Sequence, residues 1–411
     1  MSIDEITDIN TIDDSISKET TSNTSFLHKD NFSDLIKTVV FLTASYLTDP
    51  LANAHLCFRK TYVVDNLNPL SSKIANLARK LFLLVQVVGY TLLAIIGTLP
   101  GIIIRAIVSS LEKERFIHLS TQGKGKILPE NRRFSLGSWN ATTGLASGHT
   151  ITDAGVEHWS TRIDEIVEKI IEYGANVQTL YEAMDIKSAV YLCKKLKEHG
   201  FVDFYFNIGS RAFGTSSGMF IASKYKIKNP EFVMFPKDTF SNRAKYSEKG
   251  VFSFELQSKG KTFAKVFSTH PQHSEEPAYA PKEDVDAREK QMKIVVDKIK
   301  QEKKDKCIIL TGDLNIDDYE LENSSWWKEG IFEKGVKFSE SEKTWGGDEF
   351  CSSLLDTNKK ISGPLNLDHT MIVKNTAKLI ETILIHTGYN PKVYTKEALS
   401  DHAGLFSLIT V

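Results

Sequence analysis

Cys307-Ile-Ile-Leu-Thr-Gly-Asp-Leu-Asn315 is the stretch that decides the fold of this chain. It begins as an apolar run and ends in polar side chains, which is the pattern of a buried strand with polar residues at its end. Three other segments of the chain also end in an amide, a carboxylate or an imidazole: Ser-Trp-Asn140, Ser-Thr-His270 and Ser-Asp401-His402. Each tripeptide is common by chance, but the ordered set predicts side chains that converge on one cleft.

The sequence from about residue 130 alternates between strand-like and helix-like patterns. Arg133 to Asn140 and Asn176 to Leu180 predict strands, and the apolar residues of 163–171 recur at helical spacing. The same patterns predict further strands at 202–206, 218–223, 251–256, 262–267, 367–373, 380–385 and 404–409, and helices over 186–196 and 284–300. This alternation predicts an α/β domain over residues 129–411.

The composition is that of a globular chain long enough for more than one folding unit. Of 411 residues, 41% are hydrophobic, which suffices for a sizeable core. The 51 basic and 52 acidic residues leave no bulk attraction for nucleic acid, so a nucleic-acid partner is not favoured. The cysteines have no Cys-x-x-Cys spacing and predict reduced, structural thiols in a reducing or cysteine-neutral compartment. They are Cys57, Cys193, Cys307 and Cys351.

The first 35 residues form a Ser/Thr-rich tail that we predict to be disordered, because it has almost no apolar clustering. Its acidic start lacks the basic region and apolar run of a secretory signal. The tail suits a plain linker and a non-classical export segment equally.

Residues 81–104 contain no charged residue and are long enough to cross a hydrocarbon core of about 30 Å. We therefore predict a helical, membrane-associated region over residues 36–128, in which 36–47 lies at the interface or packs against the apolar run. Pro100-Gly101 predicts a helix break, so a re-entrant hairpin fits the segment at least as well as a single span. Basic residues on both sides give no orientation. The alternative is a buried helical pair covering the α/β domain, although a core helix seldom runs this long without a polar face.

The polar residues suit metal-assisted cleavage of a phosphate ester, which needs a cation, a positioned water and a base. Mg²⁺, with Mn²⁺ as the alternative, prefers oxygen ligands such as those of Asn140, Glu182 and Asp401. His402 is the candidate general base, because an imidazole accepts a proton best when a carboxylate fixes its tautomer. Asp368 is the candidate for that carboxylate.

Three more residues receive candidate roles at the phosphate. Asp313 would orient the attacking water, Asn315 would donate to a phosphoryl oxygen, and His270 would donate to the same phosphate or protonate the leaving group. Taken singly, each polar residue has a structural alternative, such as a strand-end turn or a helix cap. Nothing in the sequence assigns three other histidines to the cleft, and we expect them to be structural or exposed: His273, His369 and His386.

These segments resemble the motifs of the endonuclease/exonuclease/phosphatase superfamily of metal-dependent phosphoesterases, over about residues 130 to 411. The matching segments are Ser138-Trp-Asn140, Asn176-Val-Gln-Thr-Leu-Tyr-Glu182, Gly312-Asp-Leu-Asn315, Leu367-Asp-His-Thr-Met-Ile and Ser400-Asp-His402. The resemblance implies a four-layer sandwich of two mixed β-sheets flanked by helices, here preceded by a helical hydrophobic region. By position it implies Mg²⁺ binding by Asn140 and Glu182 and water activation by His402.

A second resemblance is to the neutral sphingomyelinase pattern, in which "THLQ" precedes an "R-x-x-Q" helix. Its counterpart here is Ser268-Thr-His-Pro-Gln-His-Ser-Glu275, followed by Arg288-Glu-Lys-Gln291. Pro271 replaces the usual Leu, Tyr181 stands where Gln precedes the metal-binding glutamate, and His369 replaces a Tyr. None of these departures removes a reacting group, but Tyr181 bears on the geometry of the glutamate.

The leading hypothesis is a membrane-associated, Mg²⁺-dependent sphingomyelin phosphodiesterase that releases ceramide and phosphocholine, with residues 81–104 holding it near its lipid. The second hypothesis is an inositol-phosphate phosphatase or a nuclease. Such an enzyme would need more lysine and arginine around the cleft than the motif segments contain. The third is an inactive, membrane-anchored interaction protein, which is disfavoured because every reacting position is filled. The residues leave the headgroup, the host compartment and the oligomeric state open.

Overall fold

The computed structural model describes residues 32–67, 72–111, 115–143, 159–209, 215–274, 280–334, 343–345, 365–385 and 399–411. Most of the predicted tail, residues 1–31, lies outside these ranges, as do Glu275, Cys351 and His386. The other three cysteines are buried free thiols, as expected for reduced structural residues.

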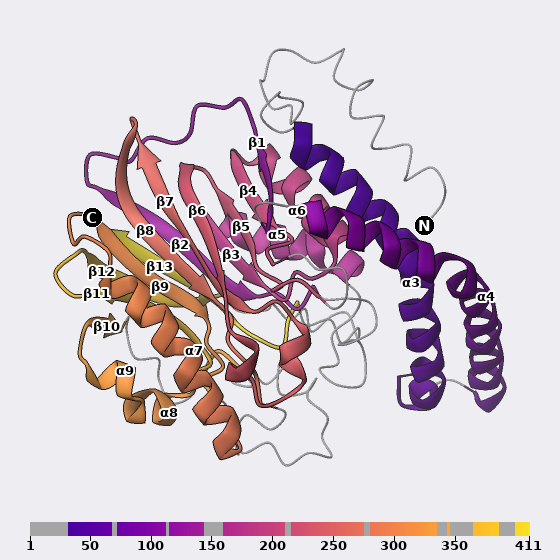
Figure 1. Ribbon diagram of the computed structural model, residues 1–411. Coiled ribbons are helices and arrows are strands. Elements are labelled where there is room, and N and C mark those ends of the chain that lie inside the picture. Colours follow the sequence, from indigo (N-terminus) through magenta and orange to yellow (C-terminus); the bar gives the residue numbers. More distant parts are fainter. Residues whose placement is uncertain are drawn as a thin grey trace.

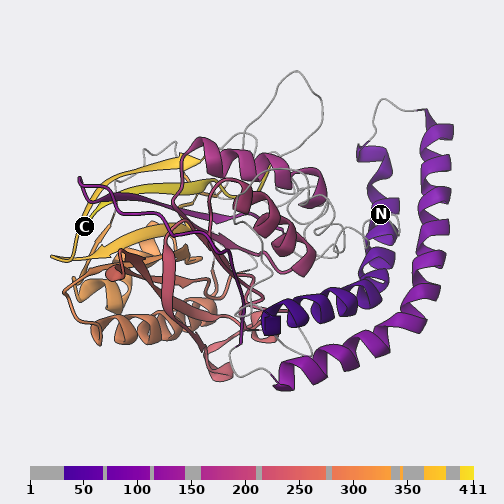
Figure 2. The same ribbon diagram turned by 90° about the horizontal axis from the view of Figure 1, so that it is seen from above.

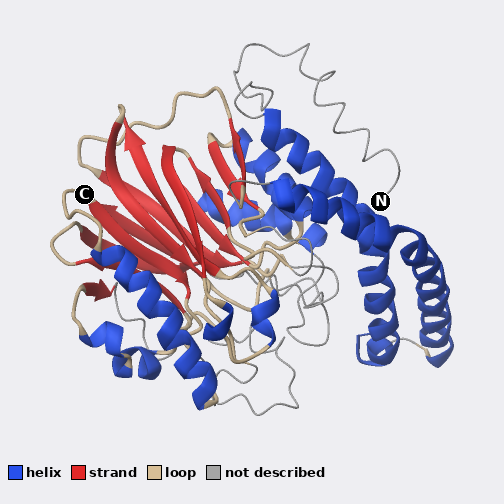
Figure 3. Ribbon diagram, viewed as in Figure 1, coloured by secondary structure: helices blue, strands red, loops and turns tan. Residues whose placement is uncertain are grey.

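A seven-stranded mixed sheet forms one half of the sandwich (Figures 1 and 3). Its strands lie in the order β1-β4-β5-β3-β2-β13-β12, and only β2 and β3 pair in parallel. The strands are β1 (Ile117–Ser120), β2 (Arg133–Asn140), β3 (Val177–Tyr181), β4 (Asp203–Phe206), β5 (Phe220–Ser223), β12 (Lys378–Ile385) and β13 (Gly404–Thr410). The edge strand β1 precedes residue 129, so the sheet begins before the expected domain boundary.

A six-stranded mixed sheet forms the other half, in the order β10-β11-β9-β8-β7-β6, with β8 and β9 in parallel. Its strands are β6 (Lys226–Met234), β7 (Gly250–Ser258), β8 (Lys261–Thr269), β9 (Cys307–Asp313), β10 (Phe332–Lys334) and β11 (Asp368–Val373). The position of the central strand β9 explains why its sequence is almost continuously apolar. Ile309 faces the core between the sheets, whereas Ile308 and Leu310 face the helices outside, so both faces of the strand are buried.

Helices cover the two outer faces and complete the four layers. On the first sheet lie α5 (Ile163–Glu172) and α6 (Ile186–Glu198), and on the second lie α7 (Lys282–Lys300), α8 (Asp318–Asn323) and α9 (Ser325–Lys328). Short 3₁₀ turns occur at Trp159–Thr161, Lys237–Thr239 and Arg243–Tyr246. The predicted four-layer α/β sandwich is confirmed.

Two long helices, α3 (Phe32–Leu67) and α4 (Lys73–Leu111), form a hairpin that extends away from the sandwich (Figure 2). The base of α3 is tied to the sandwich. Phe41 and Leu42 join the apolar cluster on the outer face of the first sheet, and the Asp49 carboxylate pairs with Lys187 at the start of α6. The predicted segment 36–47 is thus the part of α3 that joins the hairpin to the sandwich.

The helix break predicted at Pro100-Gly101 is wrong, because α4 is helical from Lys73 to Leu111. The proline removes one helical hydrogen bond, which usually kinks or breaks a helix. Here two glycines let α4 pack closely on α3: a Cβ at Gly97 would lie 2.5 Å from the Leu47 carbonyl oxygen, and one at Gly101 would lie 2.9 Å from that of Ala44. This packing offsets the lost bond.

The outward side of α4 is apolar and uncovered by any part of the chain that the structure describes. Only 17% of its most apolar window is buried, and the mean hydropathy of that window is 2.1. This exposure differs from the buried helical pair considered as the alternative. The exposed side chains include Phe82, Val85, Val88, Leu92, Ile95, Ile96 and Leu99.

Candidate active site

Strand direction brings the predicted polar residues to one edge of the sandwich. Asn140 ends β2 and Asp313 ends β9, while His270 directly follows β8. Asp368 begins β11, which runs antiparallel to β9 and places Asp368 opposite Asp313 in the register. His402 lies just before β13, which runs antiparallel to β2. Residues that are far apart in the sequence therefore meet, as the motif order predicts.

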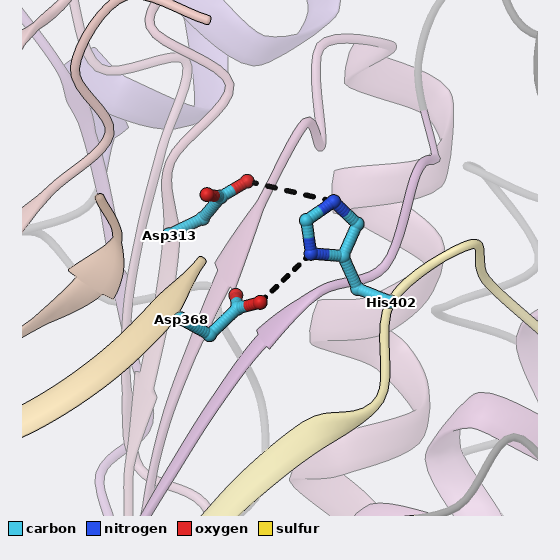
Figure 4. A group of neighbouring side chains, drawn as sticks. All are labelled: Asp313, Asp368 and His402. Carbon is cyan, nitrogen blue, oxygen red and sulfur yellow. Dashed lines mark hydrogen bonds and ion pairs between the residues drawn. The ribbon is translucent and has the colours of Figure 1, made fainter. Parts of the chain in front are cut away.

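His402 and Asp368 form a buried hydrogen-bonded pair at the centre of this edge (Figure 4). The His402 Nδ1 atom lies 2.8 Å from Asp368 Oδ2, and His402 Nε2 points toward Asp313 Oδ2 at 3.8 Å. Burial alone would lower the pKa of His402, but the carboxylates of Asp368, Asp313 and Asp401 outweigh it and hold that pKa well above the ordinary value. With Nδ1–H donating to Asp368, the neutral ring leaves Nε2 as the proton acceptor.

The Asp313 carboxylate contacts several of the other polar residues of the site. Its Oδ2 accepts a hydrogen bond from Asn140 Nδ2 at 2.9 Å and lies 3.5 Å from His270 Nε2. Its Oδ1 accepts from the Asn315 backbone N–H at 3.0 Å. Burial, together with the Asp368 charge, raises the pKa of Asp313 to about 7. The preceding Gly312 has no room for a side chain, because a Cβ would lie 2.0 Å from the Thr269 carbonyl oxygen.

Backbone contacts hold the His402–Asp368 pair in place. The Thr344 hydroxyl accepts hydrogen bonds from the backbone N–H groups of Leu367 at 2.9 Å and Asp368 at 3.1 Å. The Thr344 carbonyl accepts from Ala403 N–H at 2.7 Å, beside His402. One threonine outside every recognised motif therefore links Asp368 to the residue that follows His402.

Thr142 forms hydrogen bonds with the side chains of both Asn140 and Asp401. The Asn140 side-chain oxygen accepts from the Thr142 backbone N–H at 3.1 Å, and the Thr142 hydroxyl donates to Asp401 at 2.6 Å. The buried Arg162 guanidinium donates to backbone carbonyls of both segments. Two of the three candidate metal ligands are thus held next to each other.

Glu182, the third candidate ligand, follows β3 in the left-handed backbone conformation, with φ of 61°. This conformation is uncommon outside glycine and indicates a position fixed by its surroundings. Gly218 packs against it, since a Cβ there would lie 3.0 Å from Glu182 Cα, and the Ala183 N–H donates to the Gly218 carbonyl at 2.8 Å. The Glu182 charge contributes to the raised pKa of Asp313, which makes Glu182 a neighbour of the group around His402.

Three side chains, those of Asp313, Asp368 and His402, offer ligand atoms within 4.8 Å of one another. This group could hold a metal ion by geometry, but the Asp368–His402 contact already uses His402 Nδ1. An imidazole is also a softer ligand than the oxygens that Mg²⁺ prefers. We therefore keep Asn140, Glu182 and Asp401 as the candidate ligands for a hard cation.

Tyr181, which departs from the family pattern, bridges the two sheets beneath His270. Its hydroxyl lies 2.9 Å from Ser268 Oγ and 3.1 Å from Thr179 Oγ1. Its ring meets the His270 ring edge-on at a centroid distance of 5.8 Å. Burial raises the pKa of Tyr181 to about 12, so the phenol stays neutral and acts as a support for His270.

The residues of the sphingomyelinase-like pattern position the loop after His270. The Gln291 side-chain oxygen accepts from the Gln272 backbone N–H at 2.9 Å. Arg288 donates to Ser274 Oγ at 2.7 Å and pairs with Glu320. The helix that carries Arg288 and Gln291 thus fixes the loop rather than entering the group around His402. Asn315, with φ of 54°, donates to a carbonyl of the same loop at 3.4 Å.

The sequence patterns missed Lys249, which is only 3% exposed and directly precedes β7. Burial lowers its pKa to about 8, against the opposing charges of Glu182 and Asp313. The sequence did contain a signal for this position. The strands predicted at 251–256 and 262–267 follow each other along the chain. If they pair antiparallel, the residues just before the first strand lie beside the residues just after the second strand. By contrast, His369 Nε2–H donates to the Ile316 backbone carbonyl, with 2.7 Å between the two heavy atoms, and the side chain is buried as a structural residue.

No protein-family model and no curated protein matches this chain. Among solved structures, the beta toxin 275-280 from Staphylococcus aureus is 20% identical, with a TM-score of 0.51 over 67% of this chain and 99% of that one. A humanized D. rerio TDP2 is 17% identical, with a TM-score of 0.50 over 68% and 100%. Sphingomyelinase C from Streptomyces griseocarneus is 18% identical, with a TM-score of 0.48 over 67% and 98%.

These likenesses show the fold. The chain has the same overall fold as the beta toxin and TDP2 structures, which is the four-layer architecture that its sequence pattern predicts.

Proposed function

We propose that this chain is a metal-dependent phosphodiesterase that hydrolyses a phospholipid headgroup at a membrane surface, with sphingomyelin as the first candidate substrate. The observation that carries the proposal is the buried His402–Asp368 pair beside Asp313, at an edge where further oxygen ligands converge. The beta toxin and TDP2 structures support the fold in which such a site would work.

The residues fit a hard divalent cation, Mg²⁺ or Mn²⁺. Asn140, Glu182 and Asp401 offer oxygen atoms only, which is the donor set that such cations prefer. The Asp313 and Asp368 carboxylates offer oxygen atoms within 4.8 Å of each other. Burial and this crowding raise the pKa of Asp313 to about 7, and a bound cation would relieve the repulsion. When bound, the cation would neutralise charge that develops on the phosphoryl group.

The protein side chains would supply the proton transfers. Nε2 of His402 would take a proton from water while the water oxygen bonds to phosphorus, and the Asp368 carboxylate would stabilise the resulting imidazolium. Asp313 would orient the water, and Asn315 would donate to a phosphoryl oxygen. The phosphorus bond to the leaving oxygen then breaks with its electron pair, and His270 would donate to that oxygen or to the phosphate.

A phospholipid substrate is supported by the exposed apolar side of α4. The run 81–104 carries no charge, and the helix that contains it leaves large apolar side chains in solvent along its length. Burying such a surface in a bilayer would hold the site near lipid headgroups. A soluble phosphatase or nuclease has no need for this surface.

A substrate panel tests the function. Full-length protein with Mg²⁺ is offered sphingomyelin, phosphatidylcholine, phosphoinositides and DNA, and the released products are measured with and without EDTA. We expect phosphocholine from sphingomyelin and loss of turnover in EDTA. Turnover of DNA or phosphoinositides alone would assign the alternative enzymes, and no turnover of any substrate would favour the interaction protein.

A charged pair of substitutions tests the membrane surface. Val88 and Ile95 are 61% and 73% exposed on α4. The double variant Val88→Asp/Ile95→Asp should bind vesicles at least about 100-fold more weakly, because each charge costs about 3 kcal/mol in hydrocarbon. Vesicle sedimentation measures the binding. Hydrolysis of a soluble phosphodiester should stay unchanged.

The matched control is Tyr319→Asp on α8, where the side chain is 79% exposed but lies on the sandwich. It should bind vesicles like the unaltered protein. Equal vesicle binding by all three proteins would show that α4 is not the membrane surface.

A further inference from the structure

Lys249 is a buried cation at the edge of the candidate site that no motif includes. A lysine that is only 3% exposed loses most of its hydration, and such a position is rarely kept unless the ammonium faces a partner. The adjacent Glu248 carboxylate is not a dedicated partner for this ammonium, because it already lies 3.6 Å from the side-chain nitrogens of both Arg115 and Lys237. The charges of Glu182 and Asp313 oppose the lowering of the Lys249 pKa by burial, which makes these two carboxylates the anionic neighbours of the ammonium.

Backbone contacts place Lys249 between the Glu182 turn and the loop after His270. On one side, residue 251 pairs with residue 269 in the β7–β8 register, so the chain before β7 runs alongside the loop that begins at His270. On the other side, Glu248 N–H donates to the Thr215 carbonyl at 3.1 Å. Residue 218 of that same segment packs on Glu182. The position of Lys249 is therefore fixed from both sides.

The charges around Lys249 change when a cation is bound. A divalent cation at Glu182 would take up much of that carboxylate's charge, and the ammonium would then be left with fewer anionic partners in a buried site. A phosphodiester brings a negative charge to the same place. The arrangement therefore favours an anionic ligand over an empty site.

We propose that Lys249 contacts the substrate, donating from its ammonium to a non-bridging phosphoryl oxygen and stabilising the charge that builds there. This inference rests on the proposed function and adds a residue to it. Lys249 keeps its protons throughout, since His402 accepts the proton from water and the leaving oxygen departs with its electron pair. Its contribution is electrostatic, as for a donor in an oxyanion hole.

The test compares Lys249→Met with Lys265→Met. Lys265 is also buried, at 6% exposed, but its partners Glu255 and Glu302 lie away from the His402 edge. For a soluble phosphodiester, Lys249→Met should lower kcat/KM by about 100-fold or more, the effect of removing one oxyanion-hole donor. Lys265→Met should stay near the unaltered value. Thermal unfolding of both variants checks that each is folded.

Two binding measurements separate this role from a purely structural one. Affinity for inorganic phosphate, measured by calorimetry, should fall in Lys249→Met, while Mn²⁺ affinity, measured by electron paramagnetic resonance, should be unchanged or higher. A loss of Mn²⁺ affinity would overturn the proposal, because Lys249 would then act by positioning Glu182. Unchanged phosphate affinity would overturn it as well. If the unaltered protein hydrolyses no diester, weaker phosphate binding by Lys249→Met still supports the contact while the proposed function fails.

Discussion

Replacing His402 by alanine is expected to lower kcat by about 10²–10⁴-fold, the usual contribution of a positioned general base. The reason lies in the geometry: Nδ1 is held by Asp368 at 2.8 Å, and Nε2 faces Asp313 at 3.8 Å where a water could be deprotonated. Single-turnover hydrolysis of a soluble phosphodiester measures the effect. The control is His199→Ala, an exposed histidine at the end of α6, which should leave kcat unchanged.

Asp368→Asn should also lower kcat strongly, and the double variant should be scarcely slower than His402→Ala alone. Groups that act as one unit give losses that do not add. Additive losses for the two substitutions would show that Asp368 does not serve His402.

The pH profile gives an independent readout of the same pair. Because His402 must be neutral to accept a proton, kcat should rise with pH as His402 loses its proton. The Asp368 carboxylate is one of the charges that raise the pKa of His402. Asp368→Asn should therefore move this limb to lower pH while the plateau falls. A limb that stays in place would assign the titration to another group.

Replacing Glu182 by glutamine is expected to lower turnover by more than about 100-fold, because a bound cation supplies several kcal/mol of transition-state stabilisation. The substitution keeps the size of the side chain and removes the charge that a hard cation needs. Since Glu182 is partly exposed, the thermal unfolding temperature should change little. Chelation of the unaltered protein should abolish turnover, and Mg²⁺ or Mn²⁺ should restore it.

The control for this prediction is Glu198→Gln, which removes an exposed carboxylate at the end of α6. It should leave both turnover and Mn²⁺ affinity unchanged. Full activity of the unaltered protein in EDTA would contradict the metal mechanism, whatever Glu182→Gln does.

Local pattern was enough for most of the sandwich. The strand that ends at Asp313 is apolar because both of its faces are buried. Its apolar residues are consecutive, so the pattern can be recognised from the local sequence alone. Helices α5 and α6 end near Gly174 and Gly200, which adopt positive φ values of 73° and 82° that glycine accommodates readily. These features can be recognised from the sequence without knowing which sheet or helix packs against the segment.

Local pattern failed where a distant partner decides the outcome. Pro100 predicts a helix break, but packing of Gly97 and Gly101 against α3 keeps α4 continuous. Thr344 belongs to no motif, and its link between Asp368 and the segment of His402 exists only because β11 and β13 meet at one edge.

The sequence by itself determined the polar residues and their order along the chain, and with them the class of fold, because strand periodicity and strand-end chemistry are local. Only the tertiary structure decided which of those residues touch. Asn140 donates a hydrogen bond to Asp313, and His402 forms one with Asp368. Lys249, which belongs to no motif, is buried near the charges of Glu182 and Asp313. Those contacts depend on how two sheets pack face to face, and packing is a property of residues far apart in the chain.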